Sequence, residues 1–178
     1  MIENLEALSS FLTSLLPFSS FIALIGLLIA MLTRLFKNDK IKVIGIALFV
    51  QIFILALLLI IVQSMMTKNI RNEILGILAD PKTEIVVNYN DFGSLQPEEL
   101  KKELFKLKDI PANHSHPTGK KTIPVISAAG NFNLFIAQDS NDAKEFWIFT
   151  DKYDRSEETE IGKIITSNIK LENVNTLE

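Results

Sequence analysis

The chain has 178 residues, 48% of them hydrophobic, a formal net charge of −3 and no cysteine. Without cysteine it has no disulfides, no thiol catalysis and no cysteine-based zinc site. From Lys68 onward, 14 Lys and Arg stand against 18 Asp and Glu, so this part lacks the broad positive field typical of proteins that bind polymeric nucleic acid.

Two long uncharged apolar segments, Ala7–Thr33 and Val43–Met66, lie in the N-terminal third. The second, with 24 residues, would extend about 36 Å as a helix, enough to cross a hydrocarbon core of about 30 Å. The sequence therefore predicts a two-helix transmembrane hairpin over residues 18–66. Glu3 and Glu6 precede the first segment where a secretory signal peptide would be basic, so we expect no cleavage.

The first 17 residues form a separate pattern. Apolar residues recur there at helical spacing, at Ile2, Leu5, Leu8, Leu12 and Leu15. This spacing predicts a short helix lying at the membrane interface, ended by Pro17 before a span that begins near Phe18. One long kinked helix is the alternative.

Three residues of the spans are candidates for helix assembly. Gly26 and Ala30 form a small-xxx-small pair, which lets two helices approach closely. Gln51 needs a hydrogen-bond partner within the hydrocarbon. It either joins neighbouring copies in a homo-oligomer or lines a pore, or else it faces the other helix of its own hairpin.

The turn between the spans, Arg34–Lys42, carries four basic residues, while the N-terminal flank carries none. The positive-inside rule would place this turn in the cytoplasm and the C-terminal part outside. However, Lys68, Arg71 and Lys82 follow the second span closely, so the count is four against three and the orientation stays open.

After a helical connector over residues 67–83, the pattern predicts a soluble α+β domain, residues 84–178. Alternation over Glu84–Tyr89 indicates a first strand, and Pro97–Leu107 an amphipathic helix with two glutamates in its first turn. Four further strands are predicted: Thr122–Ser127, Phe132–Gln138, Lys144–Thr150 and Glu160–Thr166. Because the turns are short, we expect a mostly antiparallel sheet of about five strands with one helix on a face.

The predicted strand around Phe146–Phe149 is apolar on both faces. Phe146 and Ile148 point one way, and Trp147 and Phe149 the other. This pattern is typical of a central strand between two layers. As an alternative, Trp147 is a stacking surface for a nucleotide base.

The segment Asn113–Lys121 is the candidate ligand site. It gathers donors suited to a phosphate: His114, Ser115, His116, Thr118, Lys120 and Lys121. A metal site would need a third ligand such as Asp139 or Asp142, and none is predicted. The other interpretation is a solvated turn. Because the sequence carries no nucleophile elbow, P-loop, metalloprotease helix or dinucleotide fingerprint, we expect neither enzymatic activity nor a cofactor.

The order of parts resembles the small two-span, β-domain effectors of bacterial anti-phage cyclic-nucleotide signalling. These include the Panoptes effector that accompanies a minimal CRISPR polymerase and, more distantly, the β-barrel membrane effector of CBASS. The resemblance rests on four segments: His114–Pro117, Asp139–Ser140, Glu145–Phe149 and Glu160–Gly162.

This resemblance implies that a cytoplasmic domain binds a cyclic dinucleotide or oligonucleotide. The nucleotide would control whether clustered spans damage the lipid bilayer of the bacterial inner membrane. In the Panoptes type it holds the effector inactive, and in the CBASS type it triggers assembly. The charge of the Arg34–Lys42 turn favours a different function, a membrane-anchored periplasmic interaction or scaffolding module without a nucleotide.

Overall fold

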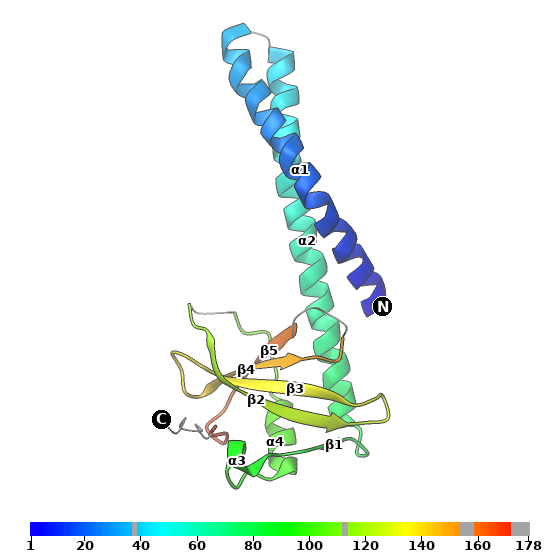
Figure 1. The fold of residues 1–178 in the computed structure, drawn as a ribbon, viewed down its shortest axis with the longest axis vertical. Coiled ribbons are helices and arrows are strands. Elements are labelled where there is room, and N and C mark those ends of the chain that lie inside the picture. Colours follow the sequence, from blue (N-terminus) through cyan, green and yellow to red (C-terminus); the bar gives the residue numbers. More distant parts are fainter. Residues whose placement is uncertain (37–38, 112–113, 154–158, 172–178) are drawn as a thin grey trace, which may run out of the picture. The chain divides into compact units, whose positions relative to one another are not determined.

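The computed structural model describes residues 1–36, 39–111, 114–153 and 159–171. It consists of two compact units, Met1–Met66 and Thr67–Glu178. The first is a helical hairpin and the second a small domain with a five-stranded antiparallel sheet (Figure 1). The predicted fold class, a membrane-type hairpin followed by an α+β domain, is confirmed.

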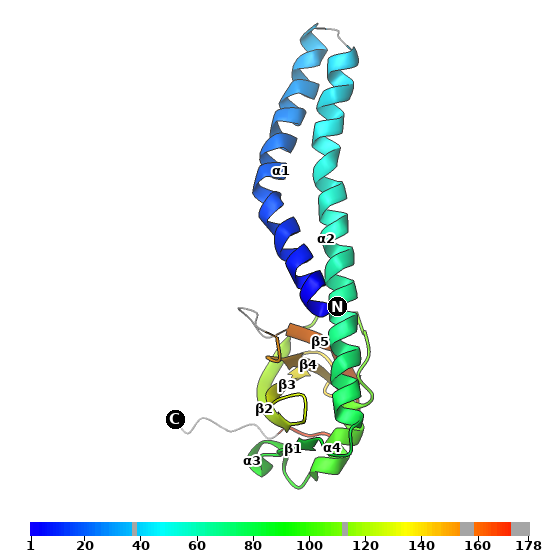
Figure 2. The same cartoon turned by 90° about the vertical axis from the view of Figure 1, so that its right-hand side faces the viewer.

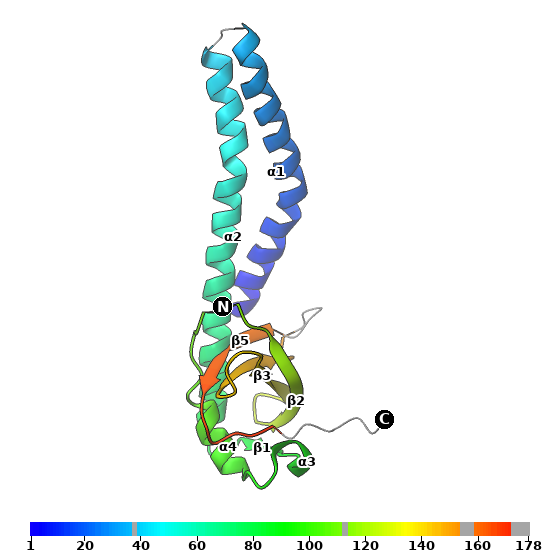
Figure 3. The same cartoon turned by 90° about the vertical axis from the view of Figure 1, so that its left-hand side faces the viewer.

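The two helices of the hairpin are α1 (Ile2–Phe36) and α2 (Asp39–Ala79). Both are long and apolar enough to cross a membrane. Pro17 lies inside α1, so the N-terminal residues continue into the span without the break that the sequence suggested. A proline within a helix removes one backbone hydrogen bond and favours bending, and α1 curves along its length (Figures 2 and 3).

Small and polar residues join α1 to α2 within one hairpin. A Cβ at Gly26 would lie 2.6 Å from the carbonyl oxygen of Gly45, and one at Gly45 would lie 2.7 Å from the Ala30 nitrogen. Gln51 Nε2 donates to the Ser19 carbonyl oxygen at 2.9 Å, and the Ser19 hydroxyl donates to Gln51 Oε1 at 3.0 Å. Gln51 therefore adopts the second predicted arrangement, facing the other helix of its own hairpin.

The sheet of the domain follows chain order, with every neighbouring pair antiparallel. Its strands are β1 (Glu84–Ile85), β2 (Pro117–Ile126), β3 (Phe132–Asp139), β4 (Glu145–Thr150) and β5 (Thr159–Ile165). Two short helices lie between β1 and β2, namely α3 (Tyr89–Phe92) and α4 (Pro97–Leu104). Pro97 opens α4, and the Gln96 backbone nitrogen donates to Glu99 Oε2 at 3.4 Å.

The core lies between the helices and one face of the sheet. In the domain, the last part of α2 and α4 lie along the same side of the curled sheet (Figures 2 and 3). Both the helices and the sheet contribute fully buried apolar residues to this core: Ile70, Ile74, Leu78, Leu100, Leu104, Ile123, Leu134, Ile136 and Ile148. Residues 67–79 are therefore a core helix of the domain, which begins at Thr67 and not at Glu84.

Two predicted strand boundaries differ from the structure by four residues or more, and α4 ends at Leu104, three residues before the predicted Leu107. The first strand ends at Ile85, because the Asn88 side chain accepts a hydrogen bond from the Asn90 nitrogen and starts the helical turn α3. The second begins at Pro117, five residues before the predicted start at Thr122. Pairing with the end of β3 extends it, so Thr118, Lys120 and Lys121 belong to a strand and not to a loop.

The strand β4 lies inside the sheet and is buried on both faces, as its sequence predicted. Phe146 and Ile148 are fully buried in the helix-covered layer. On the opposite face Trp147 is 6% exposed and Phe149 is 9% exposed. These two form a small second cluster with Ala137, against which Phe135 packs.

Candidate functional site

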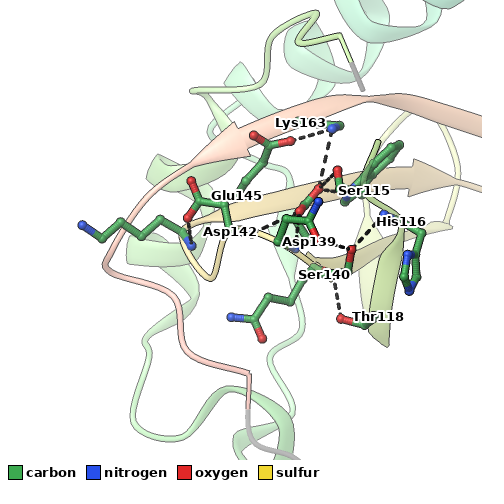
Figure 4. Close-up of polar contacts among 12 residues, drawn as sticks. Ser115, His116, Thr118, Asp139, Ser140, Asp142, Glu145 and Lys163 are labelled. Atoms are coloured by element: carbon green, nitrogen blue, oxygen red, sulfur yellow. Dashed lines mark hydrogen bonds and ion pairs between the residues drawn. The ribbon is translucent and has the colours of Figure 1, made fainter. Parts of the chain in front are cut away.

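The candidate segment is fixed to the end of β3. The His116 backbone nitrogen donates to the Ser140 hydroxyl at 3.1 Å, and the Ser140 nitrogen donates to the His116 carbonyl oxygen at 3.0 Å (Figure 4). Two residues further along, the Thr118 hydroxyl donates to the Gln138 carbonyl oxygen at 2.9 Å. His114 and His116 are exposed, and His114 has a φ of 53°. Asn113, which opens the predicted segment, lies outside the described residues.

A buried polar cluster lies beneath this segment, on the face of the sheet away from the helices. Ser115 donates its hydroxyl to Asp139 Oδ2 at 2.5 Å, and Trp147 Nε1 donates to the same oxygen at 2.8 Å (Figure 4). Lys163 Nζ lies 2.5 Å from Glu145 Oε1, 3.8 Å from Asp139 Oδ2 and 3.6 Å from the centre of the Trp147 ring. Trp147 and Lys163 are cross-strand partners, which explains their contact.

Asp139 has its acceptor positions filled. Besides Ser115 and Trp147, the backbone nitrogens of Asn141 and Asp142 donate to its second oxygen at 2.8 and 3.2 Å. Burial raises the pKa of Asp139, but the hydrogen bonds from Ser115, Asn141 and Trp147 outweigh it and hold that pKa well below its usual range. The carboxylate stays ionised, and four donors leave it no further lone pair for a metal ion.

The cluster changes the interpretation of two predicted ligand residues. The Ser115 hydroxyl is committed to Asp139, which fixes the segment to the sheet. Trp147 is 6% exposed, its indole N–H is bonded, and Lys163 lies over its ring. The sequence alternative in which a base stacks on Trp147 therefore lacks an open ring face, and we do not include Trp147 in the candidate ligand surface.

The lysines of β2 point to opposite faces of the sheet. Lys121 Nζ forms an ion pair with Asp91 Oδ1 at 2.8 Å, and both side chains are mostly buried. Lys120 is exposed, and its Nζ lies 4.5 Å from the centre of the Phe149 ring and 5.8 Å from that of Phe135. Consecutive residues of a strand point to opposite faces, which accounts for this divergence. The pairing with β3 shifts register between Thr118 and Lys121, where Gly119 has a φ of 61°.

A hollow of about 490 Å³ opens beside these lysines, where the chain leaves β1. Its lining combines cationic, amide, hydroxyl, carboxylate and apolar groups, from Val86, Asn88, Asp91, Lys120, Lys121, Thr122 and Pro124. The Asp91 charge is balanced by Lys121 and by a hydrogen bond from Asn88 Nδ2 to Asp91 Oδ2. The hollow can therefore receive an anion with polar and apolar parts.

Sequence reasoning missed Asn88, Asp91, Thr122 and Phe135 as neighbours of the candidate lysines. Asn88 and Asp91 precede Lys121 by about thirty positions and approach it only through the fold. Thr122 lies opposite Phe135 in the register of β2 and β3. Only the strand register, which the sequence left undefined, could have brought this pair into the site.

Within the described parts of the chain, no three His, Asp or Glu side chains gather as a metal-ligand set. Comparison with protein-family models, curated proteins and solved structures gives no match to this chain.

Proposed function

We propose that this chain is a membrane effector of bacterial anti-phage defence. Its C-terminal domain lies in the cytoplasm and binds a cyclic dinucleotide or oligonucleotide, without enzymatic activity. Binding controls the disruption of the inner membrane by assembled transmembrane helices. The observation that carries this proposal is the hollow beside Lys120 and Lys121, in a chain whose N-terminal unit has two span-length apolar helices.

The lining of the hollow supports a nucleotide as the ligand. Ammonium groups form strong charge-assisted hydrogen bonds with phosphate oxygens. The Thr122 hydroxyl and the Asn88 amide can bond sugar or base atoms, while Val86 and Pro124 supply apolar contact. His114 and His116, exposed just before β2, extend the donor surface along the same part of the chain.

The hairpin supports membrane disruption by several copies. Two helices are too few to enclose an aqueous pore, so damage requires lateral assembly into a homo-oligomer. In lipid such assembly depends on side-chain packing and interhelical hydrogen bonds. Since Gly26, Ala30 and Gln51 already join α1 to α2, we assign them to the rigidity of each hairpin.

The test uses the full chain in vesicles filled with a self-quenched dye, with cyclic dinucleotides present on both sides of the membrane. We expect at least one cyclic dinucleotide to change the rate of dye release several-fold. Substituting Lys120→Met together with Lys121→Met should raise the concentration needed for this effect by tens-fold or more. The loss of the Lys120 contact weakens binding by roughly 1.5–3 kcal/mol, and the loss of Lys121 leaves the Asp91 carboxylate unpaired beside the bound anion.

The matched control replaces two exposed lysines elsewhere, Lys102→Met with Lys144→Met, and changes the net charge equally. This control should respond to the nucleotide like the unmodified protein. Dye release that no cyclic dinucleotide alters would contradict the proposed function. Equal responses of the two double variants would contradict the proposed site.

The basic turn favours a second candidate function. Its four Lys and Arg residues favour a cytoplasmic turn, and hence a periplasmic domain. In that case the chain is a membrane-anchored interaction or scaffolding module, and the hollow receives a partner other than a cytoplasmic nucleotide. The membrane topology separates the two candidates.

A further inference from the structure

An aromatic surface adjoins the hollow on the face of the sheet away from the helices. Phe135 is partly exposed there and packs against the cluster of Ala137, Trp147 and Phe149. Its cross-strand partner is Thr122, which is exposed and also lines the hollow. The hollow and the Phe135 ring are thus parts of one continuous surface.

Lys120 belongs to both parts of this surface. It lines the hollow, and its ammonium group lies within cation–π range of Phe149 and Phe135. An exposed cation–π contact is weak, so a ligand can displace it at small cost. The displaced ammonium group then remains within reach of an anion bound in the hollow.

We propose, building on the proposed function, that a base of the nucleotide stacks on Phe135 while Lys120 binds its phosphate. The ligand class is an anion that carries an aromatic ring. A ring is required because an inorganic anion in the hollow would gain nothing from the aromatic surface. Phe135 takes the role that the sequence suggested for Trp147, since aromatic rings stack with any base.

Trp147 supplies a direct readout. It is the single tryptophan of the chain and belongs to the cluster against which Phe135 packs. A base on Phe135 changes the surroundings of this cluster, and with them the tryptophan emission. A ligand confined to the hollow beside Asn88 and Lys121 does not contact Phe135 and should change the emission less.

The experiment uses the full chain in detergent micelles, titrated with a set of cyclic dinucleotides, with adenosine monophosphate and with pyrophosphate. Affinity is measured by equilibrium dialysis and emission by fluorescence. We expect Phe135→Leu to weaken nucleotide binding by about tenfold or more, and Phe135→Tyr to retain it, because tyrosine keeps the aromatic face. Phe105→Leu, at an exposed phenylalanine outside the site, is the control and should bind normally.

The outcomes separate this inference from the proposed function. Equal nucleotide binding by Phe135→Leu and Phe135→Tyr overturns stacking on Phe135 and leaves the proposed function standing. Pyrophosphate that binds as tightly as the nucleotides also overturns the inference. Phe135-dependent binding of adenosine monophosphate alone supports the stacking site and contradicts a cyclic ligand. If nothing in the set binds, both proposals fail.

Discussion

Single carboxylates in the domain keep their charge in buried positions because neighbouring groups donate hydrogen bonds to them. Asp139 is one example, and Glu103 on α4 is a second. Burial raises the pKa of Glu103, but hydrogen bonds from Lys106, Thr166 and Asn168 outweigh it and lower this pKa from 4.5 to about 2. Because Thr166 and Asn168 follow β5, Glu103 ties α4 to the last described part of the chain.

This lowered pKa predicts acid sensitivity. A carboxyl group with a lower pKa in the folded state stabilises the protein above its unfolded-state pKa of 4.5, and that stabilisation is lost as the pH falls towards 2. We expect this group alone to account for a loss of about 3 kcal/mol in the free energy of unfolding over that interval. The pKa of Asp139 is also lowered in the folded state, so its protonation at low pH destabilises the domain in the same way.

The measurement is urea unfolding of the full chain in micelles at pH 7, 4.5 and 3, followed by Trp147 emission. Glu103→Gln should lower stability at pH 7 and flatten the decline between pH 4.5 and 3. Glu98→Gln, an exposed position on the same helix, should decline like the unmodified protein. A Glu103→Gln protein with an unchanged acid decline would refute the assignment.

Among the elements, α2 belongs to both units of the chain, the hairpin and the domain. Its first part is apolar around its circumference and long enough to cross a membrane. Its last part carries Ile70, Ile74 and Leu78 at a spacing of four, which aligns them on one face of the helix. That face is buried in the domain, while Arg71 Nε donates to the Ile161 carbonyl oxygen of β5 at 2.6 Å.

We therefore predict that the fragment 67–178 folds and that the fragment 81–178 does not. The shorter fragment loses three fully buried aliphatic side chains, worth roughly 1.5–3 kcal/mol each. This loss is comparable to the whole stability of a small domain, about 5–15 kcal/mol. Thermal unfolding monitored by circular dichroism should give a cooperative transition only for the fragment 67–178.

Gly76 offers an internal control for this prediction. It lies in the same stretch of α2, and a Cβ there would meet no atom within 4 Å. Gly76→Ala in the fragment 67–178 should raise stability by up to about 1 kcal/mol, because alanine favours the helix. Equal melting of the two fragments would show that residues 67–79 are not needed for the core.

At the scale of the whole molecule, the proposed function requires the domain to lie in the cytoplasm. The turn between the helices then lies on the opposite side of the membrane, against the charge of Arg34, Lys37, Lys40 and Lys42. The three basic residues that follow the second span reduce this bias. A balance of four against three sets no orientation by itself.

A reporter fused after Glu178 measures this orientation. Under the proposed function, we expect a fluorescent protein that matures only in the cytoplasm to be bright there, and alkaline phosphatase to be inactive. A fusion with Lys40→Gln and Lys42→Gln should keep this orientation, since the substitution weakens only the opposing charge. Phosphatase activity confined to the periplasm would exclude a cytoplasmic nucleotide sensor and support the anchored module.

The sequence by itself determined the main division of this protein. Two uncharged runs of span length predict helices because the hydrogen bonds of a helical backbone lie within one segment. Alternating residues and short turns predicted the antiparallel sheet, and the apolar pattern of Phe146–Phe149 predicted its burial on both faces. These features are local, so residue spacing alone is enough to reveal them.

Only the tertiary structure decided which residues meet. It placed Ile70, Ile74 and Leu78 in the core, committed Ser115 to Asp139, paired Lys121 with Asp91, and put Phe135 beside Thr122. Each of the last three pairs joins residues at least thirteen positions apart, through a strand register or a chain crossing that local spacing does not specify. Asp139 and Lys163 enclose Trp147, whereas Phe135 stays partly exposed. The sequence could not distinguish these two aromatic residues, because their burial depends on those distant partners.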